Sequence, residues 1–318
     1  MADALLKDLP QDLPSFLERF GTDSRCRAYL VRTRWPEGFR CDACGHDHAW
    51  SHHRRLIEEC RACGKQHSIL AGTLFEQTKT GLARWFLAIY LVTSSKGGIS
   101  ALELQRQLGF RSYGTAWTWL HKIRRAMVDP DRRPLAGHVE ADETLVGGRQ
   151  PGKRGRGAAG KTVVAGAIEA APAETRKRKL GRLRLEAVAS AAGADLERFI
   201  TANVATPATI TTDGWSGYAG LEAAGYRHRA IALASSWGEA DQRLPAVHLV
   251  FGLAKRWLLG THHGAVAAKY LQAYLGEYVF RFNRRTASSP AHGFARVLQN
   301  AVRIPPATHR QIVAAGAT

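Results

Sequence analysis

Two closely spaced pairs of cysteines constrain the N-terminal part of this chain more strongly than any other feature of its sequence. Cys41 and Cys44 form one C-x-x-C pair, Cys60 and Cys63 form the other, and fifteen residues lie between the pairs. This spacing is typical of a zinc ribbon, and the glycine that follows each pair allows a tight turn. Four thiolates bound at ~2.3 Å complete a tetrahedron around Zn²⁺ and leave no open position, so we expect one structural zinc ion.

The chain is also strongly basic. Its 318 residues include 45 basic and 27 acidic side chains, which gives a net charge of +18 and an isoelectric point near 10.2. Such an excess favours a polyanionic partner, nucleic acid before a membrane, although a soluble protein with a basic surface is the alternative. The sequence has no apolar run of the ~18 residues that a membrane span needs, and its N-terminus does not resemble a signal peptide. We therefore expect a cytoplasmic, nucleoid-associated protein that uses its cysteines for metal rather than for disulfides.

The sequence around the cysteine pairs indicates a small module that is able to contact DNA. Residues 1–33 have apolar positions at helical spacing and are expected to form a helical platform beside the ribbon, which we assign to residues 34–72. Cys26 lies outside the metal-binding pattern and is expected to be a small buried residue. The ribbon either contacts DNA or only packs on its neighbours, and the residues that favour contact are Trp35, Arg40, Arg54, Arg55, Arg61 and Lys65.

Residues 73–130 have the pattern of a helix-turn-helix. An apolar helix is expected over 82–95, a second helix over 100–108 with a capping box, and a third over 113–127 after a glycine turn. In a helix-turn-helix the later helix lies in the major groove of DNA, whereas an ordinary helical hairpin is the alternative. The residues nearest the bases would be Arg111, Ser112, Tyr113 and Thr115, and further DNA contacts would come from Lys122, Arg124 and Arg125.

The periodicity changes from helical to strand-like after residue 134. Three strands are followed by a helix, a strand, a second helix, a strand and more helix. The expected strands are 139–145, 163–170, 182–189, 208–212 and 226–233, and the first helix is 193–203. This is the element order of a ribonuclease-H-like domain, in which the first and fourth strands are neighbours.

We therefore expect an α/β fold in the larger part of the chain. The ribonuclease-H-like catalytic domain, a mixed five-stranded sheet with flanking helices, would cover residues 135–290. It would be preceded by the zinc ribbon and the helix-turn-helix and followed by a C-terminal tail over residues 291–318. Within it, residues 150–161 form a glycine-rich basic segment, and its Lys153, Arg154 and Arg156 are expected to contact phosphate.

This strand order brings two aspartates to positions where they could bind metal ions. Asp142 lies where the first strand ends, and Asp213 directly follows the fourth. If the two strands are neighbours, both carboxylates meet at one rim of the sheet. Two carboxylates there can hold two divalent ions ~3.5–4 Å apart, the arrangement that supports in-line phosphoryl transfer. Mg²⁺ takes such oxygen ligands, and a third ligand usually comes from a later helix.

Five stretches of the chain match the motifs of a known family. They are RWPEGFRCDACG (34–45), ADETLVGG (141–148), TDGWSGY (212–218), KRWLLGTHHG (255–264) and YLGEYVFRFNRR (274–285). With these stretches the chain resembles the DDE-type transposases of bacterial insertion sequences with an N-terminal zinc ribbon (insertion sequence family fifteen-ninety-five). The resemblance implies a ribonuclease-H-like catalytic domain, two metal ions, and cleavage and strand transfer at the terminal repeats of the element. It also implies that Asp142 and Asp213 are the first two catalytic aspartates.

The third catalytic position departs from the commonest form of the family pattern. Lys255 matches the lysine that follows the third ligand, and His248 stands seven residues earlier, which is close to two helical turns and therefore on the same side of a helix. Many relatives have asparagine two residues before the lysine, where this chain has Leu253. Either His248 completes the site, where imidazole suits Mn²⁺ better than Mg²⁺, or this copy is impaired. Arg256 is expected to contact DNA.

Three functions follow from these features. The leading one is an insertion-sequence transposase that binds terminal inverted repeats as a homo-oligomer, cuts the DNA and joins it to target DNA. The second is a catalytically impaired DNA-binding protein that acts as a repressor or as a competitor for the ends. The third is a structure-directed nuclease, which would cut branched DNA without joining it. All three have double-stranded DNA as partner and involve neither a membrane nor a small-molecule substrate.

Overall fold

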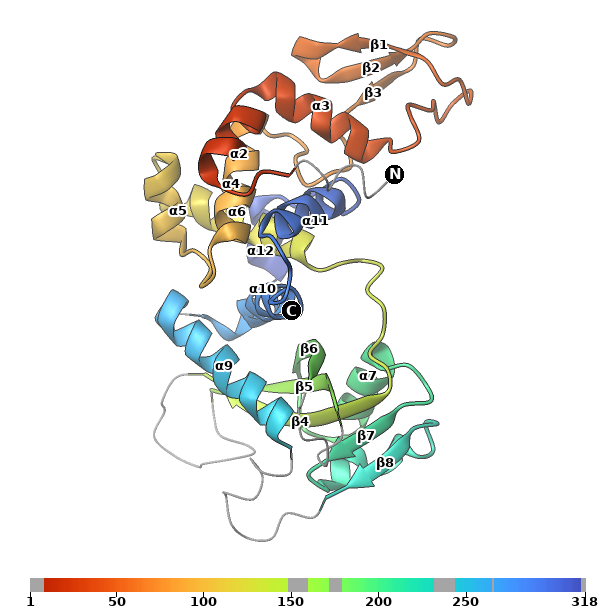
Figure 1. Ribbon diagram of the computed structural model, residues 1–318, viewed down its shortest axis with the longest axis vertical. Helices are drawn as coiled ribbons and strands as arrows, with labels where there is room; N and C mark the ends of the chain where they lie inside the picture. Colours follow the sequence, from red (N-terminus) through yellow and green to blue (C-terminus); the bar gives the residue numbers. More distant parts are fainter. Residues whose placement is uncertain (1–8, 148–159, 172–178, 232–243, 265, 316–318) are drawn as a thin grey trace. The chain divides into compact units, whose positions relative to one another are not determined.

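The computed structural model of the chain describes residues 9–147, 160–171, 179–231, 244–264 and 266–315 (Figure 1). The chain divides into two compact units. The first contains Met1–Pro130 and Thr286–Thr318, and the second contains Asp131–Arg285. Within the described residues, no helix has both the length and the apolar character that crossing a membrane would require.

Helices with a shared aromatic core form most of the first unit. Phe16, Phe86 and Phe294 are fully buried, and their ring centroids lie 5.6 Å (Phe16–Phe294) and 5.8 Å (Phe86–Phe294) apart. Trp85 and Trp119 stack with centroids 3.5 Å apart. The helices are α2 (Leu13–Phe20), α3 (Asp23–Arg34), α4 (Leu82–Ser94), α5 (Ala101–Leu108), α6 (Tyr113–Met127), α11 (Ala291–Ala301) and α12 (His309–Ala315).

The C-terminal segment is therefore not the tail that we expected over residues 291–318. Phe294 of α11 lies among the rings of α2 and α4, and Asn300 of α11 donates a hydrogen bond to the carbonyl of Ala126 at 2.8 Å. On α12, His309 is hydrogen-bonded to Thr118 of α6 at 2.7 Å. The apolar positions of residues 291–301 are spaced for one buried helical face, so this helix completes the core of the first unit.

The zinc ribbon of the first unit is a small antiparallel sheet. Its strands β1 (Ala49–His52), β2 (Ile57–Cys60) and β3 (Gln66–Ser68) lie in the order 1-2-3, with the short 3-10 helix η1 (His53–Arg55) between the first two. A buried ion pair between Arg27 and Glu58 joins β2 to α3. Cys26 on α3 is fully buried and its thiol contacts the carbonyl of Phe20, as expected for a cysteine outside the metal-binding set.

The two helices α5 and α6 begin and end as the sequence predicted. The Ser100 side chain accepts a hydrogen bond from the backbone N–H of Glu103 and caps α5. Gly109 ends that helix with a φ of 62°, a left-handed conformation that favours glycine. The hydroxyl of Ser112 then accepts from the N–H of Gly114 and starts α6.

A mixed five-stranded sheet is the centre of the second unit. Its strands are β4 (His138–Val146), β5 (Thr162–Ala170), β6 (Leu180–Val188), β7 (Thr209–Thr212) and β8 (Arg227–Ala230), in the order 6-5-4-7-8. β4, β5 and β6 pair antiparallel, while β4, β7 and β8 pair parallel. The prediction that the first and fourth strands are neighbours is confirmed.

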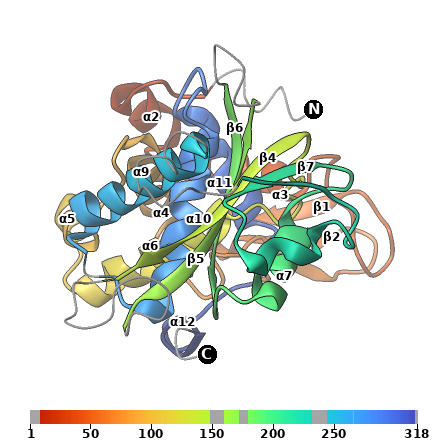
Figure 2. The same ribbon diagram turned by 90° about the horizontal axis from the view of Figure 1, so that it is seen from below.

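Helices cover both faces of this sheet (Figure 2). One face packs against α7 (Gly193–Asn203), with Val139, Ala141 and Phe199 in its core. The other packs against α9 (Pro245–His262) and α10 (Leu271–Asn283). The 3-10 helices η2 (Ser216–Leu221) and η3 (Ala268–Tyr270) complete the described elements. Because side chains alternate along β4, residues 139 and 141 face α7, and residues 140, 142 and 144 face α9.

Side chains of α10 also satisfy the outer edge of the sheet. Asn283 accepts from the N–H of Leu183 at 2.7 Å and donates to the carbonyl of the same residue at 3.1 Å. Gln272 accepts from the N–H of Ala187 at 2.8 Å. β6 is an edge strand, and these side-chain amides form the hydrogen bonds that a further strand would otherwise make with its backbone.

Candidate functional site

The register of the sheet brings the two predicted aspartates to matching positions. His138 of β4 lies opposite Thr209 of β7, and Glu140 lies opposite Thr211. The same offset places Asp142 opposite Asp213, just beyond the last paired residues. Neighbouring strands with a common register present such side chains on one face. The two carboxylates therefore lie just past the end of the β4–β7 pairing, as the strand order predicted. The expectation that the first strand ends at Asp142 was wrong, because β4 continues to Val146 in its pairing with β5.

Asp142 also contacts the helix that the sequence predicted to supply a third ligand. The Nε2 atom of His248 on α9 lies 3.0 Å from Oδ2 of Asp142. Asp142 is only 7% exposed, and its other oxygen, Oδ1, accepts from the N–H of Glu143 at 2.8 Å. Asp213 is less buried, and its Oδ1 accepts from the N–H of Trp215 at 2.9 Å, which fixes the turn after β7.

Two further contacts fix α9 along β4. The Oε2 atom of Glu140 accepts hydrogen bonds from the N–H groups of Ala246 and Val247 at 2.8 and 3.0 Å. These are free N–H groups of the first helical turn, where a carboxylate is favoured. The ammonium of Lys255 donates to the hydroxyl of Thr144 at 2.6 Å. His248 and Lys255 thus face the same side of α9, which confirms the spacing argument.

A glycine lets α9 approach the sheet closely at this point. Gly166 of β5 lies opposite Asp142 in the register. A Cβ atom added at Gly166 would lie 2.5 and 2.7 Å from two ring carbons of Phe251 on α9. Such distances are far below van der Waals contact, so any side chain there would push Phe251 away. Glycine at 166 therefore sets how near α9, and with it His248, comes to Asp142.

The other face of β4 contributes a supporting pair. Glu143 points away from α9, and its Oε2 accepts from the hydroxyl of Tyr218 at 3.1 Å. Tyr218 is 1% exposed. Burial, followed by the negative charges of Glu143 and Asp142, raises the pKa of Tyr218 well above its ordinary value. The phenol therefore stays protonated and donates to Glu143.

Lys255 experiences opposing influences at the edge of the site. Removal of its ammonium from water, with a smaller contribution from the charge of Lys161, lowers the pKa of Lys255. The negative charge of Asp142 acts in the opposite direction. The hydroxyl of Thr144, two residues after Asp142 on the same face of β4, holds the amino group of Lys255.

The four predicted zinc ligands form one cluster. The Sγ atoms of Cys41, Cys44, Cys60 and Cys63 all lie within 4.8 Å of one another, and the Cys41–Cys63 and Cys44–Cys60 pairs are separated by 3.6 and 3.5 Å. Bonds of ~2.3 Å to a tetrahedral ion imply Sγ separations of ~3.8 Å, so the cluster fits Zn²⁺.

Backbone hydrogen bonds shape the turns that hold these thiols. Gly45 donates to the carbonyl of Cys41 at 2.9 Å, and Gly64 donates to that of Cys60 at 3.0 Å. The two glycines have φ values of 75° and 72°, which glycine adopts without strain. The two cysteine pairs therefore lie on turns of the same conformation.

The three residues predicted to bind the catalytic metal form a less compact group. Asp142, Asp213 and His248 are not among the groups whose ligand atoms all lie within 4.8 Å of one another there. Their chemistry nevertheless suits divalent ions, since carboxylates bind Mg²⁺ and Mn²⁺ and imidazole favours the softer Mn²⁺. Glu277 on α10 is a late carboxylate too, but it is fully buried and pairs with Arg281 at 2.7 Å.

The predicted DNA-binding residues fall into two groups. Arg111, Ser112, Tyr113 and Thr115 are exposed or nearly so at the start of α6, and Arg256 is exposed on α9. Lys122 and Arg125 are half-buried. Arg124 was expected to contact DNA, but it is only 2% exposed and therefore does not belong to the outer surface. The apolar face of α6 is wider than the sequence suggested and includes this arginine. Lys153, Arg154 and Arg156 lie outside the described residues.

Sequence reasoning missed Glu140, Thr144 and Gly166. The alternation E-A-D-E-T over 140–144 was a usable signal, because it places Glu140 and Thr144 on the same face as Asp142. For Gly166 no local signal existed, since its role depends on Phe251, a residue distant in the sequence.

Family models of transposase domains match both units of the chain. A model of the ISXO2-like transposase domain matches residues 134–283, and a model of the transposase zinc-ribbon domain matches residues 21–66. Both matched domains are those of the transposases that the sequence resembles, so the predicted resemblance is confirmed.

One relative comes from a transposable element. It is described as an uncharacterized protein in transposable element ISH50 of Halobacterium salinarum and is 27% identical over 143 residues. The match covers 44% of this chain and 46% of the relative, so the chain spans about half the length of that protein. No solved structure matches the chain.

Proposed function

We propose that the protein is a DDE-type transposase that binds the terminal inverted repeats of its element, cleaves the DNA there and joins the ends to target DNA. The observation that carries the proposal is the position of Asp142 on β4 and of Asp213 directly after β7, the parallel neighbour of β4, with His248 at 3.0 Å from Asp142. The strand order 6-5-4-7-8, with the first three strands antiparallel, supports a ribonuclease-H-like catalytic domain.

Asp142, Asp213 and His248 are the residues that would hold the catalytic metal. Two divalent ions, when bound there, supply stabilisation of the attacking and leaving oxygens in phosphoryl transfer. The chain itself positions the groups: Glu140 fixes the first turn of α9, which carries His248, and Thr144 orients Lys255. Lys255 would contact an oxygen of the scissile phosphate. No covalent intermediate between protein and DNA is expected, because no nucleophilic side chain is required when water and a 3′-hydroxyl attack.

The first unit would hold the transposon end. The exposed start of α6 supports major-groove reading by Arg111, Ser112, Tyr113 and Thr115 in a helix-turn-helix. On the ribbon, Trp50 is 58% exposed and the guanidinium of Arg61 lies 4.1 Å from its ring centroid. An exposed aromatic ring beside an arginine suits contact with DNA. We expect a homo-oligomer on DNA, because two ends must be brought together.

A second candidate function is a DNA-binding protein without catalytic activity. The observation that favours it is the third position, where an imidazole stands in place of a carboxylate and Leu253 packs against the apolar core. This candidate predicts salt-sensitive binding of the element's ends without nicking in Mg²⁺ or Mn²⁺.

The test uses a duplex that carries the element's own end, taken from DNA that flanks the gene. Wild type and Asp213→Asn are compared for cutting and joining, with Mg²⁺ and with Mn²⁺. We expect wild type to cut and join and the variant to do neither. Specific binding of the end without any cutting supports the second function, and a stable protein–DNA adduct during turnover contradicts the mechanism.

A further inference from the structure

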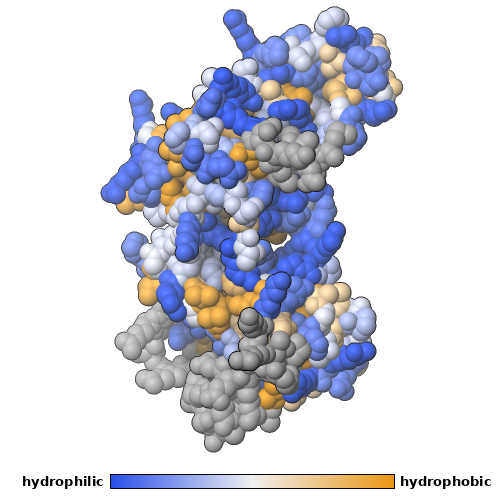
Figure 3. All heavy atoms as spheres, in the orientation of Figure 1, coloured by the Kyte–Doolittle hydropathy of each residue, from blue (hydrophilic) through white to orange (hydrophobic). Residues whose placement is uncertain are grey.

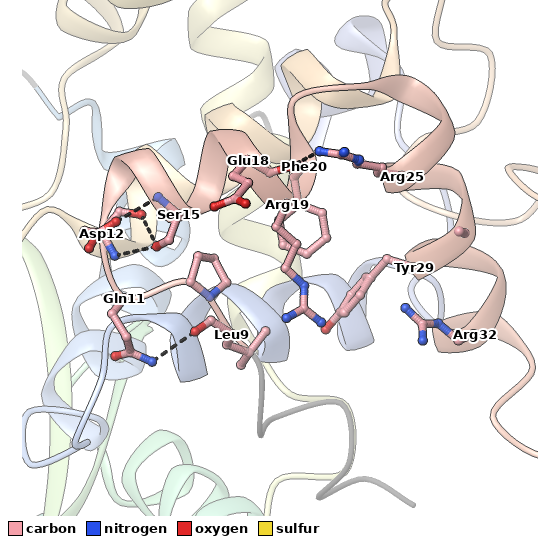
Figure 4. Close-up of a pocket in the computed structure, with 12 residues that line it drawn as sticks. Leu9, Gln11, Asp12, Ser15, Glu18, Arg19, Phe20, Arg25, Tyr29 and Arg32 are labelled. Atoms are coloured by element: carbon pink, nitrogen blue, oxygen red, sulfur yellow. Dashed lines mark hydrogen bonds between the residues drawn. The ribbon is translucent and has the colours of Figure 1, made fainter.

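A cavity of 740 Å³ lies in the first unit (Figure 4). It is formed by α2, α3 and the segment that leads into α2. Its size falls in the range of cavities that bind small molecules or parts of larger ones. Three arginines, Arg19, Arg25 and Arg32, line it together with Tyr29.

Tyr29 gives the cavity a polar group without a partner. Tyr29 is 1% exposed, and its hydroxyl has no hydrogen-bond partner among the described residues. Buried polar groups are nearly always hydrogen-bonded, so an unsatisfied one in a cavity wall points to a missing acceptor or donor. Burial raises the pKa of Tyr29 to about 12, while the positive charges of Arg19 and Arg32 oppose that increase. Those two guanidiniums are therefore the charges that act on the hydroxyl.

The same two arginines lack an anionic partner among the described residues. The guanidinium of Arg19 lies 5.5 Å from the ring centroid of Phe20, and neither Arg19 nor Arg32 forms an ion pair with a described carboxylate. The third arginine, Arg25, donates to the backbone carbonyl of Glu18. Figure 4 shows Arg19 next to the Tyr29 ring and Arg32 on the same side, with Asp12 at the far end. The carboxylate of Asp12 already accepts from the N–H of Ser15 at 2.8 Å. One end of the cavity is thus cationic and the other acidic.

We propose that the cationic end binds one phosphodiester group of the DNA backbone, with Arg19, Arg32 and the hydroxyl of Tyr29 as donors. Guanidinium groups match phosphate oxygens in geometry and form charge-assisted hydrogen bonds with them. The carboxylates of Asp12 and Glu18 line the same cavity and would repel a second phosphate, so the site takes a single one. The proposal rests on the DNA-binding part of the proposed function.

The net charge of the chain suits this ligand. Many hydrophilic side chains are visible on the first unit in Figure 3. The chain as a whole carries a net charge of +18, which favours approach of DNA. A contact to phosphate carries no sequence information by itself, so the site would add affinity and register rather than specificity.

The test measures DNA affinity of the full-length, zinc-loaded chain by fluorescence anisotropy over a series of KCl concentrations. Two duplexes are used, one with the element's end and one with a scrambled sequence. The variants are Arg32→Gln, Arg19→Gln and Tyr29→Phe, and the control is Arg310→Gln, which removes one charge from an exposed position of α12. Thermal melting followed by circular dichroism checks that each variant folds. If Arg19→Gln or Tyr29→Phe does not fold, the comparison of Arg32→Gln with Arg310→Gln remains the test.

We expect Arg32→Gln to weaken binding of both duplexes by about tenfold at low salt and to reduce the salt slope by about 1. Tyr29→Phe should weaken binding by a smaller factor, roughly threefold, with an unchanged slope, since no charge is lost. Arg310→Gln should change the affinity for either duplex less than Arg32→Gln does. Equal affinities and slopes for Arg32→Gln and Arg310→Gln would overturn the proposal.

A control with inorganic phosphate distinguishes the two possible ligands of this site, the DNA backbone and a free phosphate ion. At matched ionic strength, phosphate should raise the melting temperature of wild type more than that of Arg32→Gln. If this happens while Arg32→Gln binds both duplexes like the control, the site takes free phosphate and the DNA proposal is wrong. If wild type binds both duplexes with equal affinity, the proposed recognition of the element's end is wrong. A smaller salt dependence of DNA binding in Arg32→Gln would still support the phosphate site in that case.

Discussion

The carboxylate of Glu140 accepts a hydrogen bond from the backbone N–H of Val247, the residue directly before His248. A second hydrogen bond, from Ala246, reaches the same oxygen. Glu140 lies two residues before Asp142 on the same face of β4. The strand that carries the first aspartate therefore also fixes the start of the helix that carries the imidazole. The distance between Asp142 and His248 depends on this buried cap.

Replacement of Glu140 tests the cap. Glu140→Ala leaves two N–H groups of α9 without their acceptor, so we expect the free energy of unfolding to fall by roughly 1–3 kcal/mol. Glu140→Gln keeps an acceptor but loses the charge, with an expected loss of about 0.5–1 kcal/mol. Urea unfolding measures both, with the exposed Glu197→Gln on α7 as control, expected within about 0.5 kcal/mol of wild type. A Glu140→Ala variant as stable as that control would show that the cap does not hold α9.

Gly166 provides a test of the packing between α9 and the sheet. Gly166→Ala places a methyl group against the ring of Phe251, and we expect a loss of stability of about 1–3 kcal/mol together with reduced cleavage. The second change Phe251→Leu removes the ring atoms in conflict. The double variant should therefore be more stable than the sum of the two single effects implies. Purely additive effects in a double-mutant cycle would mean that the two residues are not in conflict.

The stability of the second unit should depend on the protonation of His228. Its Nε2 atom is hydrogen-bonded to the hydroxyl of Thr212 at 2.9 Å, and burial lowers its pKa from the ordinary value of 6.5. The unfolded chain then binds a proton more readily than the folded chain, so the free energy of unfolding decreases as the pH falls below 6.5. Urea unfolding measures this at pH 7.5 and pH 5.5. Between these values the free energy of unfolding should fall more for wild type than for His228→Gln, because the variant lacks the group that binds the proton. Equal losses would contradict the assignment.

Removal of zinc should affect the first unit alone. The four thiols close a structural site in the ribbon, whereas the sheet of the second unit has its own core. Chelation, or Cys44→Ser, should therefore increase amide hydrogen exchange in residues 41–68 and weaken binding of the element's end. Peptides from residues 131–285 should keep their protection. Equal loss of protection in both units would show that the ribbon is not an independent element.

The parts that the sequence predicted are those set by local patterns. Cysteine spacing predicted the ribbon, Ser100 and Gly109 predicted the ends of α5, and the order of strands and helices predicted the neighbours β4 and β7. The pattern also placed His248 and Lys255 on one side of α9. Each of these features depends on residues close together in the sequence or on a simple rule of element order.

The parts that the sequence did not predict depend on long-range packing. Phe294 joins the aromatic core of α2 and α4 from the far end of the chain, so residues 291–301 are not a tail. Arg124 is buried because α6 is covered on more sides than its periodicity suggested. Glu140 is important only because α9 begins beside it.

The central claim is that Asp142, Asp213 and His248 form one catalytic site, and the most direct test is a cleavage and joining assay on the element's own end. Wild type, Asp213→Asn, His248→Ala and His248→Glu are compared with Mg²⁺ and with Mn²⁺, at matched DNA binding. We predict that wild type cuts and joins, that Asp213→Asn and His248→Ala fail, and that His248→Glu remains active. Full activity of His248→Ala would contradict the claim, because the imidazole would then have no part in the site.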